Sequence, residues 1–162
     1  VASAVRAYVA DARQRLRLLH EAGASGRALN EANTAAIDAL VVALHRVAEG
    51  GVRLCLTAVG GYARRELCVH SDVDLLCLYR DSVTPYVKAV AERLQMWLWD
   101  AQVTLGGATR TLSDTIQLAR GDMTVATSLL APRFLAGSGM LFHQFTRLVQ
   151  AKLLDRPEAF IT

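Results

Sequence analysis

Proline, cysteine and long apolar runs are all scarce in this sequence, and each shortage excludes a class of protein. The 162 residues include three prolines and three cysteines, with no CxxC pair. So few cysteines argue against a disulfide framework, and Cys55 and Cys77 lie in apolar runs that are typical of reduced core thiols. No apolar run reaches the roughly 18 to 20 residues of a membrane helix, and no secretion signal opens the chain. We therefore expect a cytoplasmic protein.

Charge is also in short supply, and it is spread along the chain. The formal net charge is +3, and the arginines are scattered rather than clustered. A scattered excess of this size does not predict a nucleic-acid groove, although it is compatible with a site for an anion. Hydrophobic residues make up 52% of the chain, which indicates one compact folding unit. Because the sequence begins at Val1 without methionine, we expect it to be part of a longer multidomain protein.

Apolar periodicity predicts helices at both ends of the chain and strands between them. Helices are predicted over residues 3–22, 30–49, 84–100 and 138–154. Buried strands are predicted over residues 52–59, 73–79 and 102–111, the last with a bulge or close approach at Gly106-Gly107. After Thr111, Ser113 and Asp122 are expected to cap two helices, and Pro132 to kink or restart the second.

These elements predict an α/β (α+β) fold, a small mixed sheet flanked by helices. We expect residues 1–50 to form an N-terminal helical extension and residues 51–122 the core. Residues 123–162 are expected to form C-terminal helices packed on that core.

Two carboxylates at the start of the second predicted strand are the first candidate site. Asp72 and Asp74 are two residues apart, so they project from one face about 7 Å apart, while Val73 points into the core. Two like charges this close repel each other unless a cation lies between them, and oxygen ligands suit Mg²⁺. The pair therefore predicts a divalent metal site that would bind a metal–nucleotide complex.

Two glycines before these carboxylates are the second candidate. Gly60 and Gly61 separate a predicted strand from a short helix, so backbone N–H groups can converge on a phosphate without obstruction by side chains. Ser71 adds a hydroxyl beside the first carboxylate, and Arg110 lies where a strand-end cation could meet phosphate. A phosphate cradle beside a metal pair predicts a triphosphate site.

Each of these residues also has a simpler interpretation. Aspartate is common in turns that precede strands, and Arg110 could equally be a surface or ion-pair residue. Cys68, His70 and Asp72 alternate in a spacing compatible with zinc, but a structural zinc site needs a fourth ligand that the sequence does not supply nearby.

The segment "VGGYARREL" followed by "SDVDLLCLY" resembles the glycine and aspartate signature of the nucleotidyltransferase superfamily. It is most similar to the form found in bacterial PII uridylyltransferase/uridylyl-removing enzymes. "LWDAQVTLGGATRT" and "LARGDMTVATSLLAPRFLAG" extend the resemblance, which covers roughly residues 50–142.

The resemblance implies a nucleotidyltransferase fold and a magnesium-dependent reaction in nitrogen regulation. UMP would pass from UTP to a tyrosine hydroxyl of the PII signalling protein, releasing pyrophosphate. By the same match, Gly60 and Gly61 would bind the triphosphate, Ser71 would assist, and Asp72 and Asp74 would be catalytic metal ligands. Enzymes of this family also carry phosphohydrolase and glutamine-sensing domains, which are not in these 162 residues.

The sequence departs from the family pattern at three points. Ala63 and Arg65 replace glycines, which would cost about 1 kcal/mol or more wherever φ must be positive. Residues 102–111 lack the third carboxylate, and we assign no general base. Two alternatives therefore stay open: a nucleotide-binding regulatory module with weakened catalysis, and a transferase of the same fold acting on a small molecule or RNA.

Overall fold

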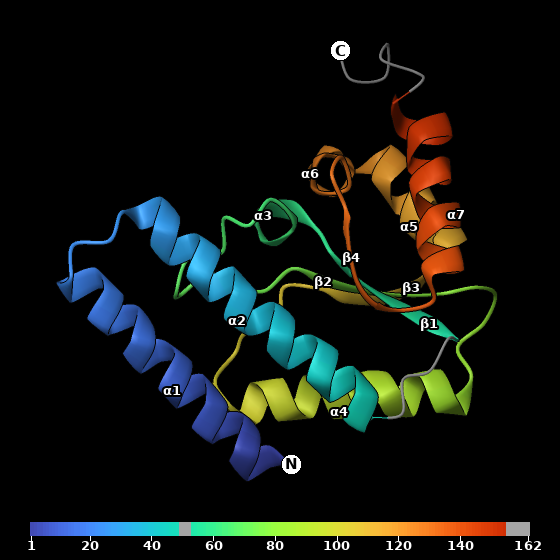
Figure 1. Ribbon diagram of the computed structural model, residues 1–162. Coiled ribbons are helices and arrows are strands. Elements are labelled where there is room, and N and C mark those ends of the chain that lie inside the picture. Colours follow the sequence, from blue (N-terminus) through green and yellow to red (C-terminus); the bar gives the residue numbers. More distant parts are fainter. Residues whose placement is uncertain (49–52, 155–162) are drawn as a thin grey trace.

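The structure is a computed structural model that describes residues 1–48 and 53–154. Its centre is a sheet of four strands in the order β3-β2-β1-β4 (Figure 1). The strands are β1 Leu54–Ala58, β2 Leu75–Tyr79, β3 Ala108–Thr111 and β4 Arg133–Gly137. Strand β1 is antiparallel to both β2 and β4, whereas β2 and β3 are parallel. The predicted small mixed sheet is therefore confirmed.

Helices cover both faces of this sheet (Figure 1). The helices α1 Ala2–Glu21, α2 Gly26–Val47 and α4 Pro85–Asp100 pack on one face, and α5 Leu112–Gly121, α6 Met123–Ser128 and α7 Gly139–Val149 pack on the other. A short helix, α3 Gly60–Ala63, follows β1, and a π-helical turn, Gln150–Leu154, follows α7. In the part of the chain that the structure describes, no helix is long and apolar enough to span a bilayer.

Strand β2 explains why both faces need helices. Leu75 and Cys77 belong to the core beneath α1, α2 and α4, whereas Leu76 and Leu78 belong to the core beneath α5, α6 and α7. All five residues of the strand are buried. A strand that is covered on both faces has a continuous apolar sequence, and this pattern predicted β2.

The predicted helices are confirmed, with adjusted ends. Helix α2 begins at Gly26 because the Ser25 side chain accepts a hydrogen bond from the Ala28 amide. Asp122 caps α6 as predicted, but α5 is capped by Thr111 instead of Ser113, since the Asp114 amide donates to its hydroxyl. The predicted starting residue of the first strand, Val52, and the predicted last residue of the second helix, Glu49, lie outside the described residues.

The prediction that Pro132 kinks or restarts a helix is wrong, because strand β4 begins at Arg133. Proline disfavours helical backbone in the residue before it, so the chain leaves the α6 region extended. Pairing with β1 then fixes it as a strand, with Ala136 opposite Leu56 and Arg133 opposite Ala58. This partner lies more than 70 residues away in sequence, so local periodicity gave little sign of the strand.

Candidate functional site

Val73 fixes the direction of the two carboxylates. It forms an isolated parallel bridge with Leu105, and its amide donates to the Thr104 carbonyl at 2.8 Å. Its side chain is buried in the core beneath α4, as predicted. Neighbouring side chains alternate in extended backbone, so Asp72 and Asp74 project to the side opposite Val73. Asp72 is exposed and Asp74 is partly buried.

Two glycines bracket the Asp74 carboxylate. A β-carbon built on Gly60 would lie 2.8 Å from Oδ2 of Asp74, and one built on Gly106 would lie 2.6 Å from Oδ1. The same β-carbon on Gly106 would lie 3.1 Å from Cβ of Asp72. Gly60, Asp72, Asp74 and Gly106 therefore meet at one place, where the lack of glycine side chains lets the backbone approach the carboxylates closely.

Gly106 is a site residue that the sequence interpretation did not name. The sequence did give one sign of it, because Gly106-Gly107 interrupts a predicted strand. This interruption predicts only a bulge or a close approach of the backbone. The close approach is real, because a β-carbon on Gly107 would overlap the Leu75 carbonyl and one on Gly106 would press on Asp74. Only the pairing of β3 with β2 shows which side chain Gly106 accommodates.

The electrostatics of the pair favour a bound cation. Burial, and secondarily the charge of Asp72, raise the pKa of Asp74 above its ordinary value. Within residues 1–48 and 53–154, neither carboxylate forms an ion pair with a protein cation. Two carboxylates that no protein cation of the described residues pairs with fit a magnesium ion that takes its other ligands from phosphate oxygens and water.

The raised pKa predicts how Asp74 affects the metal-free fold. A carboxyl whose pKa is raised on folding costs stability as the pH rises through its ordinary and then its raised value. Asp74→Asn removes this ionisation, so we expect the metal-free variant to melt at a higher temperature than the parent at pH 7. The gain should shrink as the pH falls toward 4. Thermal unfolding between pH 4 and 8 in EDTA measures this difference.

The control for this experiment is Asp81→Asn, which changes an exposed aspartate outside the site. It should leave the melting temperature close to that of the parent at every pH. Equal melting temperatures for Asp74→Asn and the parent across the whole range would contradict the assigned electrostatics.

Gly60 also shapes the turn that follows β1. Its φ is +59°, a left-handed value that glycine adopts without steric cost, and α3 begins at this residue. The Val59 amide donates to the Asp74 carbonyl at 3.0 Å, which ties the turn to the carboxylate segment. The first N–H groups of a helix lack intrahelical acceptors, so those of Gly60 and Gly61 are available to a phosphate.

The two replaced glycines differ in their backbone. Ala63 lies inside α3 and is tolerated, whereas Arg65 has a φ of +62°. Left-handed backbone costs a non-glycine residue about 1 to 2 kcal/mol. Arg65→Gly should therefore stabilise the fold by up to about 1 kcal/mol, after allowance for the greater freedom of glycine in the unfolded chain. Urea unfolding at equilibrium measures this change.

Arg64→Gly is the matched control, because Arg64 has an ordinary φ of −77°. There glycine relieves no strain: it adds freedom to the unfolded chain and removes the exposed Arg64–Glu66 ion pair, so the control should lose stability. If Arg65→Gly also loses stability, the claim that the left-handed backbone at Arg65 is strained would be contradicted.

Ser71 and Arg110 lie apart from this convergence. Ser71 is exposed and lines a hollow on the Val73 side together with Tyr8 and Asn33. Arg110 pairs with Leu78, four residues beyond Gly106 along the chain. At about 3.3 Å per residue its Cα lies about 13 Å along the strand from Gly106. The structure thus brings together Gly60, Asp72 and Asp74 and leaves these two outside.

Among the described residues, other acidic and sulfur side chains do not complete a larger metal cluster. In the described part of the chain, no three His, Cys, Asp or Glu residues are placed to hold a metal ion. The zinc interpretation of Cys68, His70 and Asp72 therefore gains no support. Two further acidic residues follow the third predicted strand, and both lie at helix starts. Asp114 is in the first turn of α5, and the Asp122 side chain caps α6.

Comparisons with known proteins identify the family of this chain. The DUF294 nucleotidyltransferase family model matches residues 10–106. Bifunctional uridylyltransferase/uridylyl-removing enzymes are also similar. That of Cereibacter sphaeroides is 41% identical over 71% of this chain and 13% of its own length. Those of Burkholderia vietnamiensis and Aromatoleum aromaticum are 44% and 35% identical over 67% and 93% of this chain, and 13% and 17% of their own lengths.

The matches thus span less than a fifth of these relatives. The family match, in contrast, covers more than half of this chain and includes Gly60, Asp72, Asp74 and Gly106. The chain belongs to the DUF294 family of nucleotidyltransferases.

Proposed function

We propose that this chain transfers UMP from UTP to a tyrosine hydroxyl of a PII signalling protein, with magnesium. The observation that carries the proposal is the convergence of Asp72 and Asp74 between Gly60 and Gly106. The names of the similar enzymes support uridylyl transfer as the reaction. The proposal assigns only the transfer reaction to this chain, with residues 51–122 as the catalytic core.

In this proposal the side chains hold and orient the nucleotide. Asp72 and Asp74 would bind the magnesium ion that accompanies UTP, and the N–H groups of Gly60 and Gly61 would bind its phosphate oxygens. When bound, magnesium supplies positive charge to the attacking and leaving oxygens of an in-line displacement. The tyrosine oxygen would form a bond to the α-phosphorus as the bond to pyrophosphate breaks, and the hydroxyl proton would pass to solvent, since no general base is assigned. Because Gly106 has no side chain to displace it, the Asp74 carboxylate could keep its present orientation when it binds that ion.

A labelled-nucleotide assay tests this function. The chain is incubated with Mg²⁺, purified PII protein and α-labelled UTP, ATP, CTP or GTP. We expect label on PII from UTP, release of pyrophosphate, and loss of both in Asp74→Asn but not in Asp81→Asn. Label that appears on RNA or on a small molecule in place of PII would contradict the acceptor.

A regulatory nucleotide-binding module is the second candidate. It is favoured by the strained Arg65 and by the lack of a third acidic ligand among the described residues. Such a module would bind Mg–UTP through the same carboxylates but transfer nothing to any acceptor. Binding without transfer, in the same assay, would select this candidate.

A further inference from the structure

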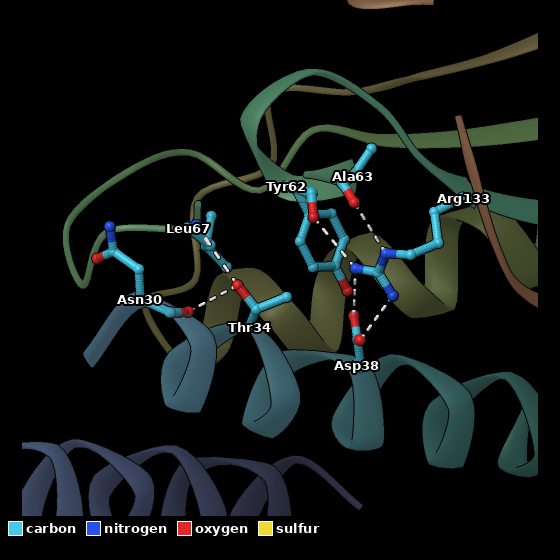
Figure 2. Close-up of polar contacts among 7 residues, drawn as sticks. All are labelled: Asn30, Thr34, Asp38, Tyr62, Ala63, Leu67 and Arg133. Carbon is cyan, nitrogen blue, oxygen red and sulfur yellow. Dashed lines mark hydrogen bonds and ion pairs between the residues drawn. The ribbon is translucent and has the colours of Figure 1, made fainter. Parts of the chain in front are cut away.

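Arg133 of β4 connects three segments that are far apart in sequence (Figure 2). Its Nη1 and Nη2 donate to the two carboxylate oxygens of Asp38 in α2, at 2.7 and 3.1 Å. Its Nε donates to the Ala63 carbonyl and its Nη2 to the Tyr62 carbonyl, both at 3.1 Å. One guanidinium thus joins α2 and β4 to the end of α3.

The guanidinium of Arg133 is largely shielded from solvent. The Arg133 and Asp38 side chains are 22% and 19% exposed, in contrast to the four other ion pairs of the described residues, whose side chains are at least half exposed. The Tyr62 ring is buried, and Cζ of Arg133 lies 5.4 Å from its centroid. Burial, and then the nearby Asp38 charge, raise the pKa of Tyr62. These contacts form a packed unit rather than a solvated surface pair.

Helix α3 needs such external support. It has only four residues, too few to be stable alone, and it ends at Ala63, two residues before the left-handed Arg65. Strained backbone of this kind persists only where its surroundings fix it. Arg133 donates to the last two carbonyls of the helix, those of Tyr62 and Ala63, and the Tyr62 carbonyl also accepts from the Arg65 amide at 3.2 Å.

A second set of contacts from α2 holds the loop after α3. The Asn33 side chain donates to the Leu67 carbonyl at 3.0 Å and to the Cys68 carbonyl at 3.2 Å. The Leu67 amide donates to the Thr34 hydroxyl, which donates to the Asn30 carbonyl (Figure 2). Helix α2 therefore holds the loop after α3, while Arg133 holds the end of α3, directly after the turn at Gly60-Gly61 (the glycine turn).

The turn has little freedom to move without disturbing the site. Gly60 already lies so close to Asp74 that an added β-carbon would come within 2.8 Å of its oxygen. A shift of α3 by a fraction of an ångström would move the N–H groups of Gly60 and Gly61 and change the contact with Asp74. We propose that Arg133, held by Asp38, is a positioning residue that sets the glycine turn for nucleotide binding. The nucleotide part of this inference rests on the proposed function.

Arg133→Lys tests the positioning role, because lysine keeps the charge but cannot serve a carboxylate and two carbonyls in a fixed fork. We expect amide hydrogen exchange of residues 63–66 to accelerate about tenfold, the effect of losing one hydrogen bond to a charged group. Exchange in the β1–β2 pair should stay unchanged. The dissociation constant for Mg–UTP should rise about tenfold for the same reason.

Arg27→Lys is the matched control, since it makes the same substitution in the exposed Arg27–Glu31 pair. It should alter neither exchange nor binding. If Arg133→Lys folds poorly, Asp38→Asn keeps the side-chain shape and should give the same local pattern with a smaller change.

Two results would overturn the inference: unchanged exchange at residues 63–66, or equal acceleration across the turn and the sheet. The second result would show a general structural role. If the parent binds no UTP, the proposed function fails, while the exchange measurement still decides whether Arg133 holds the turn.

Discussion

Gly106→Ala should abolish most magnesium-dependent nucleotide transfer while leaving the fold intact. The new methyl group would lie 2.6 Å from Oδ1 of Asp74, closer than real contacts allow, so the carboxylate must rotate away. Displacing a ligand by about 1 Å costs on the order of a hundredfold in rate. Gly106 does not have a positive φ, so alanine brings no left-handed strain, and the contact of 3.1 Å with Cβ of Asp72 needs only a small local shift.

The measurement is the rate of UMP transfer to PII, with circular dichroism to verify the fold. Gly139→Ala is a suitable control, because an added β-carbon there meets nothing within 4 Å. It should retain the parent rate. A Gly106→Ala variant that transfers UMP at the parent rate would show that Asp74 does not need its present orientation.

Asp72→Asn combined with Asp74→Asn should have a still larger effect. Both substitutions keep the size of the side chains but remove the charges that would hold the metal. Loss of several kcal/mol of metal-dependent stabilisation corresponds to a decrease in rate on the order of a thousandfold or more. Steady-state transfer at saturating Mg²⁺ and UTP measures the decrease.

Asp81→Asn again serves as the control, with an expected rate equal to that of the parent. Retention of even a tenth of the parent rate in the double variant would argue that the metal is held elsewhere. In that case the convergence of the two carboxylates would have a structural role only.

Much of the site could be predicted because its key residues are close in sequence. The alternation of Asp72, Val73 and Asp74 is a local property of extended backbone, and the burial of Val73 confirms that orientation. The glycine turn was also visible, because Gly60 interrupts a buried strand. Local patterns of this kind need no knowledge of the tertiary fold.

The missed features all depend on pairing between distant segments. Strand β4 is defined by its contact with β1, and Gly106 reaches Asp74 only when β3 lies beside β2. The Arg133–Asp38 pair joins residues 95 positions apart. The sequence alone could not decide whether Arg65 is strained, because arginine is tolerated in helical backbone and costly in left-handed backbone.

Calorimetric titration of UTP into the chain, with Mg²⁺ and then with EDTA, tests the central claim most directly. If Asp72 and Asp74 hold a metal–nucleotide complex, the parent should bind UTP in Mg²⁺, and binding should disappear in EDTA and in Asp74→Asn. Equal UTP affinity for the parent and Asp74→Asn in Mg²⁺, or binding that EDTA leaves unchanged, would contradict it.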